Sequence, residues 1–278
     1  MPYAVSPDVE IYYEVTGDPA DSPLVLVQGF GAQLIGWRDE LCDLFAAEGF
    51  RVIRLDLRDV GKSRKFGGPE DLDGGYELTD MAEDVLRVLD ALEIDRAHVL
   101  GYSMGGMIAQ VIALDHPERL RSLALLSTIP GQDPAYVLQD LSAAMSVVQP
   151  RRSRAEAIEE SVAVQRPYHS DDRPWDEAWV REAAGVAYDR CYAPDGLPRQ
   201  WAALLRATDR LERLRGVTLP TVIMHGRDDS SLHWGAAVAM ATAIEGSELH
   251  VYSGMGHELP QELWPDVVTA VARNARRR

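Results

Sequence analysis

The sequence is poor in cysteine, in positive charge and in long apolar runs. Its two cysteines, Cys42 and Cys191, are too few and too far apart for a disulfide framework or a metal site. Lys and Arg number 28 against 44 Asp and Glu, and the net charge of −16 argues against nucleic acid, whose phosphates need clustered cations. No apolar run approaches the roughly 18 residues of a membrane-spanning helix. The N-terminal segment lacks the basic stretch and apolar core of a signal peptide. We expect a cytoplasmic protein with no nucleic-acid partner and no membrane span.

Apolar, strand-like segments alternate with segments of helical periodicity through most of the 278 residues. Strands are predicted at residues 9–15, 23–29, 51–57, 97–102, 120–127, 221–226 and 248–253. Helices are predicted at residues 79–93, 104–116, 234–244 and 262–273. This alternation indicates an α/β protein, with a mostly parallel sheet and helices on both of its faces.

One stretch, residues 128–216, breaks the alternation with helical patterns and no clear strand. We interpret it as a helical lid inserted into a core domain made of residues 1–127 and 217–278. The lid carries several large apolar side chains, some of which we expect to glue its helices together and others to line a cleft. They are Tyr136, Met145, Tyr168, Trp175, Trp179, Tyr188, Tyr192 and Trp201.

A serine flanked by glycines lies at the junction between a predicted strand and a predicted helix. Gly101, Ser103 and Gly105 form the pattern G-x-S-x-G. A sharp strand-to-helix turn would strain the serine and expose its hydroxyl, while side chains at the glycine positions would clash with neighbouring backbone. Ligands of open parallel sheets bind beyond the carboxyl ends of the strands, which is where Ser103 lies. The pattern favours a nucleophile over a plain glycine turn with a surface serine.

A serine nucleophile needs a base, and the base must itself be oriented. Among the seven histidines, His257 alone lies in a glycine-rich loop just after the last predicted strand. The other six lie in strands, at helix ends or in the lid: His98, His116, His169, His225, His233 and His250. His225 ends a strand and, unlike His257, does not lie in a glycine-rich loop. The loop after it offers Asp228 and Asp229, and the residues alone leave both open as the orienting acid or as simple turn carboxylates.

These three segments, in this order, resemble the α/β-hydrolase superfamily over almost the whole chain. The resemblance implies that superfamily's fold: a mostly parallel eight-stranded sheet, helices on both faces and a helical lid insertion. In the family the acid usually follows the glycine of its loop by three positions, which implies Asp229.

Two more loops carry the resemblance. The segment VQGFG resembles the family's H-G-x-x loop, with Gln28 in place of the histidine. It implies that the backbone N–H of Phe30 forms an oxyanion hole with that of Met104, the residue after the nucleophile. The segment DLRDVGKS resembles the family's D-x-R-G-x-G-x-S loop, with Asp59 where glycine is usual.

Within the superfamily, the chain looks most like serine carboxylesterases, such as bacterial polyketide methylesterases and esterases labelled as lipases. The resemblance implies ester cleavage through an acyl-enzyme, without metal or cofactor. The lid aromatics favour a bulky apolar ester or lactone, such as a polyketide or macrolide, as the small-molecule substrate. We expect it to contact Gly29, Tyr102, Trp175, Trp179 and Trp201. A C–C bond hydrolase, a cofactor-free perhydrolase and a ligand receptor that keeps the triad stay open as alternatives, and a homodimer stays open as the assembly.

Overall fold

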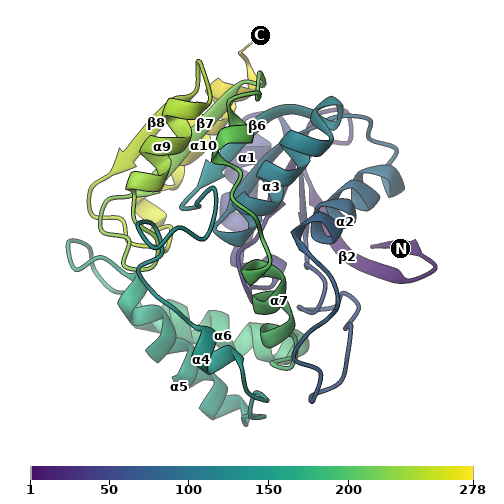
Figure 1. Cartoon of the computed structure of the whole chain (residues 1–278), viewed down its shortest axis with the longest axis vertical. Coiled ribbons are helices and arrows are strands. Elements are labelled where there is room, and N and C mark those ends of the chain that lie inside the picture. The colour runs from purple at the N-terminus through teal and green to yellow at the C-terminus, as the bar shows by residue number, and fades with distance from the viewer. Residues whose placement is uncertain (1, 278) are drawn as a thin grey trace.

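A mixed sheet of eight strands forms the centre of the molecule (Figure 1). This computed structural model describes residues 2–277, so Met1 and Arg278, the ends of the predicted core domain, lie outside it. The strand order is β1-β2-β4-β3-β5-β6-β7-β8. The strands are β1 (Tyr3–Ser6), β2 (Val9–Thr16), β3 (Ser22–Val27), β4 (Phe50–Leu55), β5 (Ala97–Tyr102), β6 (Leu120–Leu126), β7 (Thr221–Gly226) and β8 (Glu248–Tyr252). Strand β2 pairs antiparallel with β1 and β4, and β3 to β8 pair in parallel. The predicted fold, a mostly parallel sheet of eight strands, is confirmed.

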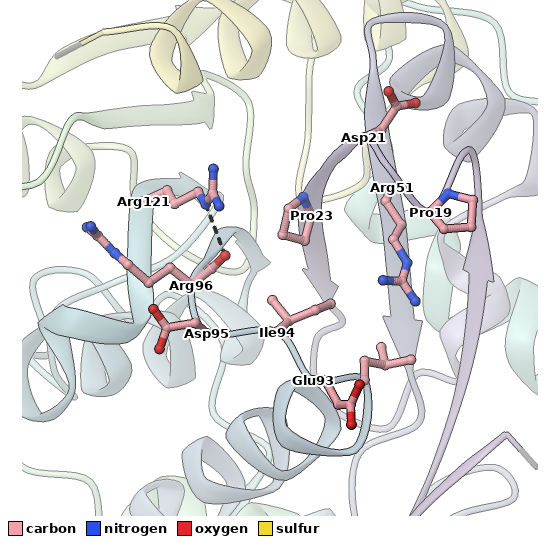
Figure 2. A pocket seen from close by; sticks show the side chains of 10 residues that line it. Pro19, Asp21, Pro23, Arg51, Glu93, Ile94, Asp95, Arg96 and Arg121 are labelled. Atoms are coloured by element: carbon pink, nitrogen blue, oxygen red, sulfur yellow. Dashed lines mark hydrogen bonds between the residues drawn. The ribbon is translucent and has the colours of Figure 1, made fainter.

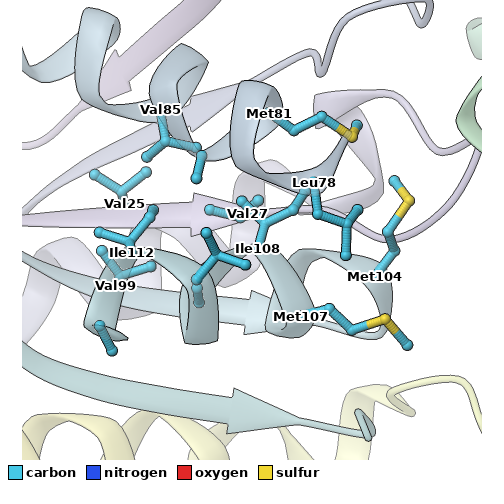
Figure 3. Close-up of a cluster of buried hydrophobic side chains, with 14 of the residues drawn as sticks. Val25, Val27, Leu78, Met81, Val85, Val99, Met104, Met107, Ile108 and Ile112 are labelled. Carbon is cyan, nitrogen blue, oxygen red and sulfur yellow. The ribbon is translucent and has the colours of Figure 1, made fainter. Parts of the chain in front are cut away.

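Helices cover both faces of the sheet, as predicted. One face carries α2 (Leu78–Ala91), α3 (Met104–Asp115) and α9 (Gly235–Ala243), and the other carries α1 (Asp39–Ala47) and α10 (Trp264–Ala275). Figure 3 shows apolar side chains of α2 and α3 packed against Val27 of β3 and Val99 of β5. Each fully buried side chain of this kind stabilises the fold by roughly 1.5–3 kcal/mol. This packing fixes the carboxyl ends of the central strands.

Two elements of the structure, β1 and α1, were not predicted from the sequence. Strand β1 has four residues and pairs antiparallel with β2 at the edge of the sheet, which is too little sequence for an alternating pattern. Helix α1 has nine residues and buries only Leu41, Cys42 and Phe45. In addition, β3 ends at Val27 rather than at the predicted Gly29, because the chain turns there into the loop beside Ser103.

A helical insertion separates β6 from β7, as predicted. It contains α4 (Ser142–Met145), α5 (Arg154–Gln165), α6 (Glu177–Cys191), α7 (Gly196–Leu205) and α8 (Leu211–Leu214). In Figure 1, α4, α5 and α6 lie together at the lower left, and α7 lies between them and the rest of the molecule. Within residues 2–277, no helix is both long and apolar enough to cross a membrane.

A buried ion pair joins α7 to the core. The Arg199 guanidinium donates from Nε and Nη2 to Oδ1 of Asp59, at 3.0 and 2.8 Å, and its side chain is 1% exposed. The Tyr76 hydroxyl donates to Oδ2 of the same carboxylate at 2.7 Å. Asp59 has a φ of 69°, the left-handed region that favours glycine. The ion pair explains why an aspartate stands where the family usually has glycine, since its contacts offset the backbone strain.

Candidate active site

Ser103 occupies a strained turn between β5 and α3. Its φ is 54° and its ψ is −121°, a conformation that residues with a side chain seldom adopt. A Cβ atom on Gly101 would lie 2.3 Å from the Gly105 carbonyl oxygen, and one on Gly105 would lie 2.2 Å from the Val27 carbonyl oxygen. The backbone therefore needs glycine at both positions, as the sequence predicts. The turn directs the serine hydroxyl away from the sheet and toward His257.

The loops that follow β5, β7 and β8 bring three side chains into one hydrogen-bonded chain. Nε2 of His257 lies 3.0 Å from Oγ of Ser103, and Nδ1 of the same ring lies 2.7 Å from Oδ2 of Asp229. A carboxylate can only accept, so Nδ1 carries the proton and Nε2 is free to accept one from the serine hydroxyl. The arrangement can remove a proton from Ser103, which is what a serine nucleophile requires.

Asp229 is held as a carboxylate in a buried position. Its Oδ1 accepts the backbone N–H groups of Ser231 and Leu232, both at 2.8 Å. Burial by itself raises the pKa of Asp229, but attraction to His257 and hydrogen bonds from His225 and His257 outweigh it and hold the pKa well below the usual range. The acid therefore stays ionised beside the imidazole.

The neighbouring carboxylate, Asp228, points elsewhere. Its Oδ2 accepts the Ser170 hydroxyl at 2.6 Å and the Gly254 N–H at 3.1 Å. Asp228 thus joins the helical insertion to the loop before His257, while Asp229 alone contacts the imidazole. Of the two aspartates that the residues leave open, the structure brings only Asp229 to the histidine.

The backbone of His257 is also fixed from two sides. Its N–H donates to the carbonyl oxygen of Tyr168 in the insertion at 2.8 Å. A Cβ on Gly256 would lie 1.9 Å from that same oxygen, so this close approach needs glycine. From the other side, the hydroxyl of Tyr102, inside the G-x-S-x-G turn, donates to the His257 carbonyl oxygen. Tyr102, predicted to contact substrate, lies where it can position the base.

Of the predicted oxyanion donors, Met104 directly follows Ser103, and Phe30 directly follows Gly29, which lies against Ser103. Met104 is the first residue of α3, so its N–H is among the donors that have no partner within the helix. In the other loop, Gly29 donates its N–H to Oε1 of Gln28 at 2.8 Å, and Gly31 donates to Oε1 of Gln200 at 2.9 Å. Across residues 2–277, no protein acceptor takes the Phe30 N–H that lies between them.

Gly29 lies against the nucleophile, since a Cβ there would come within 3.2 Å of the Ser103 Cβ. This contact explains the first of the loop's two glycines, Gly29. The position cannot carry a side chain without crowding the serine, so Gly29 leaves room for a group bound at Ser103.

The three tryptophans predicted to contact substrate lie in different surroundings. The Trp201 ring, on α7, meets the Phe30 ring edge-to-face with centroids 5.5 Å apart. The Trp175 ring packs against the His169 ring within the insertion, with the ring centroids 5.1 Å apart. The guanidinium carbon of Arg38 lies 3.7 Å from the centroid of the Trp179 ring. Trp201 is thus the one in contact with the oxyanion loop, while Trp175 and Trp179 make contacts that hold the insertion together or against α1.

His225 is a site residue that the sequence prediction misses. Its Nε2 lies 3.2 Å from Oδ2 of Asp229, and the ring is fully buried. The prediction sets His225 aside because it ends a strand and, unlike His257, does not lie in a glycine-rich loop. The spacing of four residues to Asp229 is the signal that could have found it, since a tight turn after a strand brings such residues together.

Other features lie away from this site. A surface pocket lined by Arg51, Arg96 and Arg121 sits at the amino ends of β4, β5 and β6, the edge of the sheet opposite Ser103 (Figure 2). In the described part of the chain, no three His, Cys, Asp or Glu side chains are grouped as for a metal ion.

Comparisons with known proteins find relatives over most of the chain. A family model described as alpha/beta hydrolase fold matches residues 22–261. Rhodomycin D methylesterase DauP of Streptomyces sp. strain C5 is 29% identical over 97% of this chain and 96% of its own length. A relative from Variovorax paradoxus, RutD, whose name refers to carbamate hydrolysis, is 30% identical over 89% of both chains. The 2-hydroxy-6-oxo-2,4-heptadienoate hydrolase of Pseudomonas putida is 28% identical over 86% of this chain and 83% of its own.

Solved structures show the same architecture. A hydrolase from Pseudomonas aeruginosa superposes with a TM-score of 0.78 at 26% identity, covering 99% of this chain and 98% of its own. The likeness therefore extends through the helical insertion as well as the sheet.

Proposed function

This chain belongs to the α/β-hydrolase fold family, and on that premise we propose that it is a serine hydrolase that cleaves carboxylic esters. The observation that carries the proposal is the hydrogen-bonded chain from Ser103 through His257 to Asp229. The similarity to rhodomycin D methylesterases over nearly the full length supports an ester as the substrate.

In the proposed mechanism, Nε2 of His257 takes the hydroxyl proton as Oγ of Ser103 attacks the ester carbonyl carbon. The N–H groups of Phe30 and Met104 stabilise the resulting oxyanion, and losing one such donor typically raises the barrier by about 2.7–4 kcal/mol. Asp229 remains ionised and stabilises the imidazolium.

Collapse of the oxyanion breaks the ester C–O bond. His257 gives its proton to the departing alcohol, which leaves an acyl group on Ser103. Water then attacks this acyl-enzyme with His257 again as the base, releasing the acid and restoring the hydroxyl. These steps use no metal or organic cofactor, so EDTA should leave turnover unchanged.

We further propose that residues 128–216 act as a lid and that the substrate is a bulky, mostly apolar ester or lactone, such as a polyketide or macrolide. The contact between Trp201 on α7 and Phe30 supports this, because an aromatic side chain of the insertion packs against the loop to which we assign an oxyanion donor. Apolar, aromatic surfaces of this kind bind large ligands and exclude water.

A second candidate is hydrolysis of a C–C bond in a vinylogous diketone. It is favoured by similarity to the 2-hydroxy-6-oxo-2,4-heptadienoate hydrolase of Pseudomonas putida and the 2-hydroxymuconate semialdehyde hydrolase of Pseudomonas sp., each 28% identical. The same serine, base and oxyanion donors would serve either reaction, so substrate turnover must decide between them.

The test is hydrolysis of p-nitrophenyl esters of increasing acyl length, with a dienoate diketone measured in parallel by its absorbance. We expect ester turnover in the unmodified protein and a loss of roughly 10³- to 10⁶-fold in Ser103→Ala with the fold retained. Turnover of the diketone alone would favour the C–C reaction. Binding of esters without any turnover would instead indicate a receptor that keeps the triad.

A further inference from the structure

A second histidine contacts the acid of the site from inside the sheet. His225 is the fifth residue of β7, and its side chain is fully buried. Its Nε2 lies 3.0 Å from the carbonyl oxygen of Leu232 and 3.2 Å from Oδ2 of Asp229. A carbonyl and a carboxylate oxygen can only accept, so Nε2 must carry the proton. The ring therefore donates one N–H that both oxygens share.

Within residues 2–277, the other ring nitrogen has no acceptor for a second proton. Across the described residues, Nδ1 is buried and has no hydrogen-bond partner. Protonating Nδ1 would bury an N–H with no acceptor, which is costly inside a protein. The ring is thus held in one tautomer, with its donor toward Asp229 and its lone pair away from it.

With this donor, the acceptor sites of Asp229 are filled. Oδ1 accepts two backbone N–H groups, from Ser231 and Leu232, and Oδ2 accepts from His257 and His225. A carboxylate offers about four such sites. The carboxylate is held at both oxygens and cannot rotate away from His257 without breaking at least one of these bonds.

We propose that His225 is a positioning residue, which fixes the Asp229 carboxylate toward His257 and limits how strongly that carboxylate attracts the imidazolium. The inference rests on the proposed roles of Asp229 and His257. His225 does not reach the serine or the reacting atoms and exchanges no proton in the cycle. Tyr102, Tyr168 and the adjacent Asp228 are further titratable side chains near Asp229.

The direction of the effect follows from the polarity of the shared N–H. Its positive end stabilises the negative charge on Asp229 and opposes a positive charge on His257. Removing the donor leaves a carboxylate that is more mobile and holds the imidazolium more strongly. Turnover should fall, and the base should lose its proton only at a higher pH.

The experiment compares His225→Leu, which is apolar and of similar size, with His225→Gln, whose side-chain amide can restore an N–H near the position of Nε2. His225→Phe is a second apolar variant in case leucine does not fold. Thermal unfolding checks each protein, and kcat/KM for a p-nitrophenyl ester is measured across pH. We expect the apolar variants to lose about ten- to a hundredfold in kcat/KM, the range for a lost hydrogen bond to a charged group. The acidic limb of the profile should move to higher pH, and His225→Gln should recover most of both.

His98→Leu is the matched control. His98 is also a buried strand histidine, but it bonds Ser122 and Ser22 near the amino end of β5. It should lose stability without moving the acidic limb. A folded His225→Leu protein with the unmodified profile would overturn the inference. Asp229→Asn, measured alongside, separates the two claims. If it keeps full activity, the assigned role of Asp229 fails and the role of His225 fails with it, while loss of ester turnover in the unmodified protein would be needed to refute the proposed function; if it is inactive while His225→Leu is unaffected, only the role of His225 fails.

Discussion

The carboxyl edge of the sheet and the helical insertion contribute to the site in different ways. The edge supplies the Ser103, Asp229 and His257 side chains, each from a loop after a parallel strand. The insertion contacts His257 through a backbone oxygen, that of Tyr168, and contacts Gly31 through the side chain of Gln200. The side chains of the proposed triad thus come from the sheet edge alone, while the insertion packs against them. Changes at the edge should alter the rate of the chemical step, and changes in the insertion should alter stability or substrate preference.

The largest expected effect lies at the edge and distinguishes two adjacent aspartates. Asp229→Asn should lower kcat by about 10⁴-fold, because an amide holds the imidazole in the wrong tautomer. Asp228→Asn keeps an oxygen that can accept from Ser170 and Gly254, so its loss should stay within about tenfold. Steady-state kinetics on one ester checks both variants. A larger loss in Asp228→Asn would reverse the assignment of the acid and erase the contrast between edge and insertion.

The next effect is on stability, where the insertion meets the core. Arg199→Met should destabilise the protein by about 3–5 kcal/mol, because it leaves the buried Asp59 carboxylate without its partner. Arg206, also at α7, pairs with Asp73 at the surface, and Arg206→Met should cost less than about 1 kcal/mol. Denaturant unfolding of the two variants provides the comparison. Equal losses would mean that α7 is not anchored through Asp59.

A smaller effect is expected on substrate preference. Trp201→Ala removes the aromatic surface beside Phe30 and should lower kcat/KM for a large apolar ester relative to an acetate ester by about tenfold, or about 1.4 kcal/mol. Trp234→Ala, a tryptophan at the start of α9 stacked on His233, serves as the control and should leave the ratio unchanged. If both variants keep the ratio of the unmodified protein, the insertion packs against the site without selecting its substrate.

The smallest effect should come from the outer helices. Arg181 on α6 pairs with Glu159 of α5 and with Glu177, and all three side chains are substantially exposed to solvent. Arg181→Ala should change the free energy of unfolding by less than about 1 kcal/mol, since solvent screens such pairs, and should leave ester kinetics unaltered. A large loss of stability or activity would show that the outer pair α5 and α6 is coupled to the site.

The sheet edge could be predicted closely because its constraints are local. The turn needs glycine on both sides of Ser103, because a Cβ at Gly101 or Gly105 would meet backbone atoms. The pattern that predicts the turn therefore lies within one short segment. The acid needed more than local pattern. Asp228 and Asp229 are chemically identical neighbours, and which one faces His257 depends on a turn whose register came from the family resemblance.

The insertion was harder to read because its contacts are distant in sequence. Arg199 meets Asp59 across 140 residues, and neither residue signals the other. The three tryptophans of the insertion are the same residue type but lie in three different environments. Residue type alone therefore did not distinguish Trp201 from Trp175 and Trp179. His225 was missed for a different reason: its partner is only four residues away, but the search for a base favoured a glycine-rich loop, and His225 ends a strand instead.

The most direct test of the central claim, that Ser103 is an activated nucleophile at the sheet edge, is covalent labelling with a fluorophosphonate. The protein is incubated with the probe at neutral pH, digested, and mapped by mass spectrometry. We predict one label per chain, on Ser103, with none in Ser103→Ala and much slower labelling in His257→Gln. A protein that stays unlabelled, or a label that persists in folded Ser103→Ala, would contradict the account.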